Sequence, residues 1–238
     1  MLLQLILILF LLILLLLLSR KISSQIYFLF FLLTNSQKIS ITILSLFLLP
    51  GTIIHELSHF LLASILRVPT GELSVIPTID EKTGQVKAGK LMLGGSDPFR
   101  HTLIGLAPTI IGLALIFVTG KIFFPNIQPT TYNLQPIAFL GFYLLFVVST
   151  TMFSSKKDME SLKIALPIAL LIILTFYLIG LRISLTLTLI VGTEKFLKEL
   201  NGYLLISAVV NFLVFLILIL NLKLWQKILK RQILQFKQ

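Results

Sequence analysis

Residues 51–60 contain the pattern His-Glu-x-x-His, the part of this sequence best suited to chemistry. His55 and His59 are four residues apart, so on an α-helix both imidazoles project from one face and can bind one metal ion. Glu56 follows His55 directly in the chain, so its side chain is near the two histidines but does not project from the same row of the helix. In such an arrangement two neutral imidazoles and a third ligand hold Zn²⁺, and the carboxylate accepts a proton from the water that the ion acidifies. The pattern therefore predicts a hydroxide that can attack a carbonyl carbon.

The composition of the chain makes a chance occurrence of this pattern rare. The sequence contains three histidines, and two of them belong to the pattern. Burying ionisable side chains among Ile, Leu and Phe at membrane depth costs about 3 kcal/mol each on insertion scales, so such residues usually serve a function. Because the chain has no cysteine, any metal must be bound by His, Asp or Glu.

A third metal ligand is required, and Asp158 is the acidic residue that we favour. Two membrane crossings separate the motif from Asp158, which returns the chain to the same side of the membrane. Asp158 would also suit the N-cap of a following helix, since Ser154 and Ser155 precede it. The alternative ligands are Glu72, Asp80, Glu81, Asp97, Glu160, Glu194, Glu199 and His101.

The elements that carry these residues belong in a membrane. Of 238 residues, 57% are hydrophobic and 12% are charged, and the charged share is well below the roughly 25% usual for soluble domains. The apolar residues form blocks long enough to cross a bilayer, which excludes an ordinary soluble protein. The net charge of +11 comes from basic residues in short loops beside these blocks, as in proteins whose charges orient membrane helices. It therefore does not indicate a nucleic-acid partner.

We expect an all-α polytopic membrane protein with about six transmembrane helices. The predicted spans are the apolar blocks at 2–18, 39–68, 102–120, 137–153, 164–181 and 203–222, the second interrupted by Pro50. The short apolar segment at 26–33 is interfacial, re-entrant or the start of a short crossing. Residues 183–199 are predicted to be interfacial, because their apolar run is short and charged residues follow it.

Two smaller features lie outside the spans. Alternating apolar residues around a turn-like sequence at 80–84 predict a small β-hairpin or sheet at 72–93, directly after the motif helix. The basic tail at 223–238 has apolar residues on one helical face and is expected to lie on an anionic leaflet of the bilayer. The basic residues of the hairpin, of the segment after residue 153 and of the tail can share the cytoplasmic side.

This organisation divides the chain into four parts. Residues 1–38 form an N-terminal anchor helix with a short apolar segment. Residues 39–165 form the core, with the motif helix, the hairpin, two spans and Asp158. Residues 166–222 add the C-terminal spans, and 223–238 form the amphipathic tail.

Two features within the spans, one helix-bending and one polar, carry further expectations. Pro108, together with Gly105 and Gly112, predicts a bent helix that packs closely against its neighbours. This bend would make room beside the metal. Asn211 in the last span is expected to form an interhelical hydrogen bond.

The motif and its surroundings resemble the site-2 protease family of intramembrane zinc metalloproteases, the M50 peptidases. The resemblance covers about residues 39–165. It rests on His-Glu-Leu-Ser-His in a transmembrane helix, a β-rich insertion after it, Gly-Leu-Ala-Pro at 105–108, and an aspartate after the next span. The chain departs from the family around that aspartate, where Ser-Ser-Lys-Lys-Asp-Met-Glu at 154–160 replaces the usual Asn-Pro-x-x-Asp-Gly.

This resemblance implies that His55, His59 and Asp158 bind zinc and that Glu56 activates water. It further implies that the hairpin binds an unwound segment of a membrane-protein substrate by strand addition. The expected setting is the lipid bilayer of a prokaryotic cell membrane, in which the chain is an integral multi-pass protein.

Two other functions compete with this membrane-embedded zinc endopeptidase. One is a membrane protease of the gluzincin type, in which a downstream glutamate is the third ligand. Such enzymes carry Glu-x-x-x-Asp on a helix, and the sequence from Glu194 to Glu199 has no such pattern. The other is a membrane scaffold or transporter that binds a metal without hydrolysis, which a closed four-ligand site would favour.

Overall fold

The computed structural model describes residues 2–74, 78–79, 86–87, 90–93, 97–125, 136–153 and 187–229, with a few positions between 167 and 179. Most of these described residues form helices. The helices are α1 (Leu2–Thr34), α2 (Gln37–Ile65), α3 (Pro98–Phe123), α4 (Pro136–Thr151) and α6 (Leu187–Leu229). The strands are β1 (Thr70–Ser74), β2 (Thr78–Ile79), β3 (Val86–Lys87) and β4 (Lys90–Leu93). Strand β1 pairs antiparallel with β4, and β2 pairs antiparallel with β3.

Four of the described helices, α1, α2, α3 and α6, are long and apolar enough to cross a membrane, and α4 is a shorter apolar helix of 16 residues. Large apolar side chains are exposed along these helices, among them Phe10, Ile110 and Phe212. Such surfaces suit contact with lipid rather than water. The prediction of a mainly helical membrane protein is thus confirmed at this level. Most of the predicted span at 164–181, the turn at 80–84 and the tail beyond residue 229 lie outside the described residues.

Helix α1 is longer than the sequence suggested. It runs without interruption through Arg20 and Lys21 and ends at Thr34, so residues 26–33 continue the first helix and are not a separate short segment. The physical reason is that α1 contains neither Gly nor Pro, and polar residues such as Ser, Arg and Lys are tolerated in a helix. The helix ends where Asn35 adopts a left-handed conformation with φ of 52°.

Helix α6 likewise corrects two expectations. Residues 187–199, predicted to lie in an interfacial segment, form its first turns, and residues 223–229 of the predicted tail form its last turns. Glu, Lys and Leu are strong helix formers, so the charged sequence around Glu194 and Lys198 does not end the helix. The result is one helix of 43 residues.

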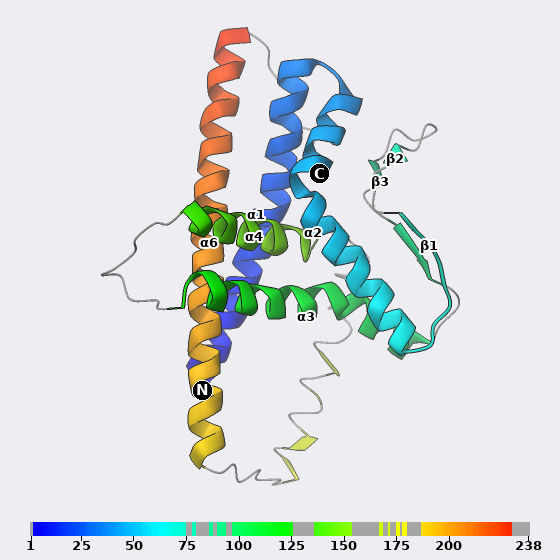
Figure 1. Ribbon diagram of the computed structural model, residues 1–238, viewed down its shortest axis with the longest axis vertical. Helices are drawn as coiled ribbons and strands as arrows, with labels where there is room; N and C mark the ends of the chain where they lie inside the picture. The colour runs from blue at the N-terminus through cyan, green and yellow to red at the C-terminus, as the bar shows by residue number, and fades with distance from the viewer. Residues whose placement is uncertain are drawn as a thin grey trace.

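Helices α1 and α6 pack side by side in the same direction, as Figure 1 shows for the blue and the orange helix. Near the start of both helices, Asn201 donates from Nδ2 to Oε1 of Gln4 at 2.6 Å. Farther along both, the Lys21 ammonium lies 5.8 Å from the ring centroid of Phe215. Residue numbers rise together along the two helices, which makes the packing parallel.

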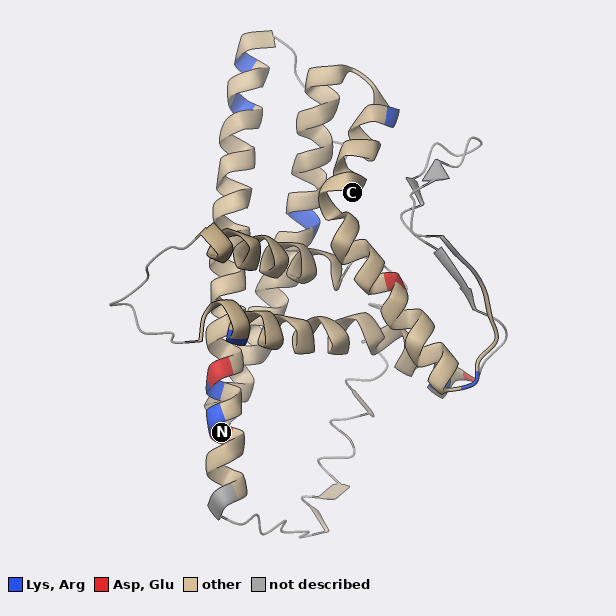
Figure 2. Ribbon diagram, viewed as in Figure 1, with Lys and Arg blue, Asp and Glu red and all other residues tan. Residues whose placement is uncertain are grey.

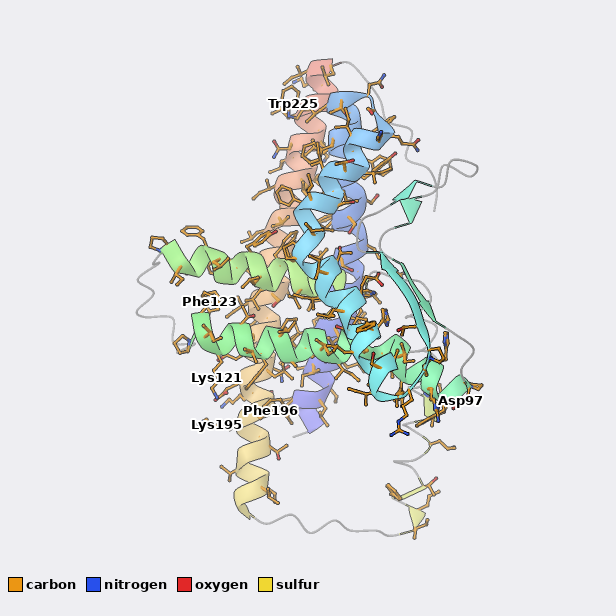
Figure 3. The ribbon with its side chains drawn as sticks, turned by 45° about the vertical axis from the view of Figure 1, so that its right-hand side comes forward. Asp97, Lys121, Phe123, Lys195, Phe196 and Trp225 are labelled. Carbon is orange, nitrogen blue, oxygen red and sulfur yellow. The ribbon has the colours of Figure 1, made fainter. Side chains whose placement is uncertain are left out.

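Helices α3 and α4 run across this pair (Figure 1). The largest buried cluster lies where they meet, and it combines residues of α1, α3, α4 and α6, including Leu15, Ile116 and Leu145. A Cβ atom added to Gly120 of α3 would overlap the ring of Tyr203 in α6, so the absence of a side chain lets the two helices approach. Lys121, Phe123, Lys195 and Phe196 lie in the same region of the molecule in Figure 3.

Charged residues mark the ends of α6 and leave its middle apolar (Figure 2). The segment between Glu199 and Lys223 has no charged residue, and at 23 residues it is long enough to cross a bilayer. Trp225 lies near the C-terminal end of α6, and Lys195 and Phe196 lie near its start (Figure 3). Aromatic and basic residues in these positions are typical of helix segments at the membrane surface.

Helix α2 ends in a tight turn that leads directly into β1. Arg67 takes a left-handed conformation with φ of 55°. The N–H of Val68 donates to the carbonyl of Ala63 at 2.9 Å and that of Arg67 donates to Ser64 at 3.1 Å. These two bonds form a Schellman motif, and the buried side chains of Ala63 and Val68 share one apolar cluster. The turn fixes where the strands begin relative to α2.

Candidate metal centre

One face of helix α2 is buried and carries the motif. Leu48, Gly51, His55, His59 and Ala63 are all buried, and the steps of three or four residues between them place them along one side of the helix. Helix α2 continues through Pro50, where the sequence predicts a kink or a restart, so the apolar block does not divide into two helices at this proline. The buried face therefore forms a continuous stripe, with the two histidines in its second half.

Gly51 sets the distance between this stripe and helix α4. A Cβ atom added to Gly51 would lie 2.5 Å from Cγ1 of Val147 and 2.8 Å from its carbonyl oxygen, and it would overlap Oγ1 of Thr151. Only a residue without a side chain permits this approach. The last turn of α4 thus contacts α2 at Gly51, one helical turn before His55 along α2.

The two imidazoles are neighbours and are shielded from solvent. His55 is 3% exposed and His59 is 9% exposed, and their ring centroids lie 4.9 Å apart at an interplanar angle of 84°. Glu56 is 8% exposed. All three side chains have interaction partners. The structure therefore places the two motif histidines side by side, and the neighbouring Glu56 is buried like them.

A hydrogen bond from outside α2 orients His59. Its ring atom Nδ1 lies 2.8 Å from the carbonyl oxygen of Ile104 in α3, and the pair is buried. A carbonyl oxygen can only accept, so Nδ1 carries the proton and donates. In the neutral imidazole, the other ring nitrogen, Nε2, then has the lone pair that can bind a metal. Metal-binding histidines commonly donate their second ring N–H to a backbone carbonyl in this way.

Several alternative third ligands have other positions in the structure. Asp97 caps the start of α3, where Oδ2 accepts from the N–H of Arg100 at 3.4 Å, and Oδ1 lies 3.2 Å from Nε of the same residue. His101 is exposed one residue later. Glu194 and Glu199 lie on α6. Among the described residues, no three His, Asp or Glu side chains form a group that could hold a metal, and this includes the motif residues themselves.

The favoured third ligand, Asp158, lies outside the described residues, as do Asp80, Glu81, Glu160 and the side chain of Glu72. The described part of the site therefore supplies two imidazoles and one carboxylate. This donor set fits zinc chemistry, because neutral imidazoles are good zinc ligands and a catalytic site usually takes its third ligand from elsewhere in the chain. His55 and His59 would hold the ion, and Glu56 would face the water bound to it.

A buried polar cluster ties α4 to α6 close to this site. Asn211 accepts a hydrogen bond at Oδ1 from Thr150 at 2.9 Å, and its Nδ2 lies 2.6 Å from Oγ of Ser149. All three residues are at most 3% exposed. The expected interhelical hydrogen bond of Asn211 is confirmed. Its partners, Ser149 and Thr150, could not be predicted from the sequence, because Ser and Thr in an apolar helix usually form hydrogen bonds to their own backbone.

The described helices also enclose an apolar cavity of about 400 Å³ between α1, α2, α4 and α6. Its lining includes Phe30, Phe47, Tyr143 and Leu218, and it includes none of the motif residues. The cavity and the metal centre are separate features of the molecule.

Comparisons of the chain with protein-family models, with curated proteins and with solved structures found no match. The function must therefore be argued from the site itself.

Proposed function

We propose that this chain is a membrane-embedded zinc metalloprotease that hydrolyses peptide bonds in or near transmembrane segments of other proteins. His55, His59 and Asp158 bind zinc, and Glu56 is the general base. Zinc held by these residues would supply Lewis-acid chemistry that lowers the pKa of a water molecule at the site. Glu56 accepts the proton of that water and later delivers it to the amine that leaves.

The hydrogen bond between His59 and Ile104 is the observation that carries this proposal. A neutral histidine whose Nδ1 donates to a buried carbonyl presents Nε2 in its unprotonated form, which is the form that binds a metal. A histidine that only packed in a helix interface would not need this arrangement together with a second imidazole at 4.9 Å and a buried carboxylate.

The approach of α4 to α2 supports Asp158 as third ligand. Thr151 contacts Gly51, one turn before His55, and Asp158 follows Thr151 by seven residues. Seven residues of extended chain reach at most about 25 Å, several times the length of a helical turn. Asp158 is thus within reach of the two histidines, and its carboxylate would complete a three-ligand site with an open fourth position.

The strands after α2 support a peptide substrate. Four residues separate the end of α2 from the start of strand β1, and the pairing of β1 with β4 makes a two-stranded sheet. An extended peptide can add to the edge of such a sheet through main-chain hydrogen bonds. We propose that this sheet holds an unwound substrate segment near the metal, as the resemblance to site-2 proteases implies.

The metal content of the detergent-purified protein tests the site. We expect close to one zinc per chain by elemental analysis, with loss of zinc in His55→Ala and in Asp158→Asn. The exposed His101→Ala is the matched control, and it should keep its zinc. Zinc that persists in Asp158→Asn would assign Asp158 to a helix cap and move the third ligand to another acidic residue.

Peptide hydrolysis is measured separately, with labelled casein and with single-span membrane proteins placed in the same lipid vesicles. Cleavage by the zinc-loaded parent, and its loss in His55→Ala, would support the protease. A parent that holds zinc and cleaves none of these substrates would favour the metal-binding scaffold. A parent without zinc in zinc-supplemented medium would contradict the proposal.

A further inference from the structure

Pro108 lies inside helix α3 and changes which backbone groups of that helix are engaged. In an α-helix the N–H of each residue donates to the carbonyl oxygen four residues earlier. Proline has no N–H, so Pro108 cannot donate to the carbonyl oxygen of Ile104. Ile104 is fully buried, where a carbonyl without its regular donor needs another partner.

The partner in this structure is His59, which comes from a different helix and from 45 positions away in the sequence. Its Nδ1 lies 2.8 Å from the Ile104 oxygen, within ordinary hydrogen-bond length. The carbonyl that Pro108 leaves without its helical donor is thus the one that His59 uses. Gly105 follows Ile104 directly and is buried, so no side chain at that position separates the backbone of α3 from its neighbours.

We infer that Pro108 is a positioning residue for the metal centre. Because Pro108 has no backbone N–H, the Ile104 carbonyl oxygen is available to accept a hydrogen bond from Nδ1 of His59. This hydrogen bond favours the His59 tautomer that is protonated on Nδ1. Nε2 is then fixed in the form that binds a metal, and the ring is fixed in one orientation. The consequence for zinc affinity rests on the proposed function, whereas the tautomer of His59 does not.

The first measurement is the tautomer of His59 in the metal-free parent protein. The chain has three histidines, so selective ¹⁵N labelling of histidine gives few signals, and His101→Gln and His59→Gln assign them. At a pH well above the usual histidine pKa of about 6.5, the ¹⁵N shifts of the two ring nitrogens distinguish the protonated from the unprotonated one. We expect the proton of His59 on Nδ1.

The second measurement compares Pro108→Ala with Pro50→Ala. Pro108→Ala restores an N–H that competes with His59 for the Ile104 carbonyl. We expect a mixture of His59 tautomers and a zinc affinity lower by roughly 10- to 100-fold, the range seen when outer partners of metal-binding histidines are lost. Pro50→Ala also restores an N–H inside a helix, in α2 itself, but it adds no competitor for that carbonyl. It should leave the tautomer unchanged and zinc affinity within about twofold of the parent.

Three results would overturn the inference. One is a parent in which His59 carries its proton on Nε2, a result that needs no variant to fold. Another is a Pro108→Ala protein with the parent's tautomer and zinc affinity. The third is an equal loss in Pro50→Ala, which would make the effect a general one of proline removal. A parent with the expected tautomer and no zinc binding would contradict the proposed function and leave the role of Pro108 in setting the tautomer intact.

Discussion

In the proposed mechanism Glu56 has a role separate from that of the metal ligands, because it would act on water while the histidines would hold the ion. Glu56→Gln keeps the size of the side chain and removes its ability to accept a proton. We expect zinc content to stay near that of the parent while hydrolysis falls by roughly 100-fold or more, the usual contribution of a general base. Zinc by elemental analysis and cleavage of labelled casein are measured on the same preparation.

Glu199→Gln is the matched control for this prediction, since Glu199 lies on α6 and does not join the two histidines in a metal-binding group. Its zinc content and rate should match those of the parent. Hydrolysis by Glu56→Gln at the parental rate would remove Glu56 from the mechanism, and loss of zinc would make it a ligand.

Asn211 illustrates how one polar residue stabilises helix packing. Asn211→Leu removes its hydrogen bonds to Ser149 and Thr150 across the α4–α6 interface. We expect the free energy of unfolding to fall by about 1 kcal/mol, the size measured for hydrogen bonds between membrane helices. The midpoint of thermal unfolding in detergent reports this change.

Asn221→Leu provides the comparison for Asn211, because Asn221 is only partly buried on the same helix and its side chain donates to its own helix, to the carbonyl of Ile217. The substitution should leave the midpoint nearly unchanged. Equal losses in the two variants would show that the buried cluster adds no stability of its own.

The shared helical face of the two histidines could be predicted from the sequence, but the hydrogen-bond partner of His59 could not. His55 and His59 share a face because of their spacing within one helix, which the sequence states directly. The bond from His59 to Ile104 joins residues 45 positions apart and depends on how α2 packs against α3. No local pattern encodes that packing, so the sequence could mark Pro108 as unusual without revealing its partner.

Between elements, the approach of α2 to α4 depends on Gly51. Gly51→Ala would place a methyl group against the Val147 backbone, so α2 must move away from α4. Overpacking of this kind costs about 1–3 kcal/mol. We expect a lower thermal midpoint and weaker zinc binding, because the shift occurs one turn from His55. Both are measured on the purified protein.

Gly192→Ala serves as the counterpart, since a Cβ atom added there meets nothing within 4 Å. Alanine favours a helix more than glycine does, so this variant should be slightly more stable than the parent. If the thermal midpoint and zinc binding of Gly51→Ala matched those of Gly192→Ala, the interface between α2 and α4 would accommodate a methyl group without separating the helices.

The sequence predicted where the apolar helices lie better than where they end. The blocks at 102–120 and 137–153 correspond closely to α3 and α4. The polar segments at 19–25 and 194–202 separate apolar runs in the sequence but lie inside continuous helices. Their polar residues lower the local hydropathy without interrupting the backbone hydrogen bonds. Glycine, proline and capping residues often mark helix ends, but α1 contains no glycine or proline and α6 continues through Gly202.

For the whole molecule, the length of α6 exceeds what a bilayer needs. Its 43 residues extend about 65 Å, roughly twice the 30 Å of the hydrocarbon core, so both charged ends should project into water. Since the chain has no cysteine, single cysteines can be introduced without background. We expect cysteines at Lys195 and Lys227 to react with a membrane-impermeant maleimide from opposite sides, and one at Leu213 not to react.

Intact and lysed cells distinguish the two sides in this labelling. Reaction of both end positions in intact cells, or of neither, would mean that α6 does not cross. Strong labelling at Leu213 would instead place its apolar middle in contact with water.

The parallel packing of α1 and α6 restricts the path of the chain between them. Two parallel neighbours that both cross a bilayer enter it from the same face, so an odd number of crossings must separate them. The expected total of six would put four crossings between them, whereas parallel packing of two crossing helices calls for an odd number. The start of α1 and the end of α6 must accordingly face opposite compartments, which reporter tags fused at the two ends would reveal.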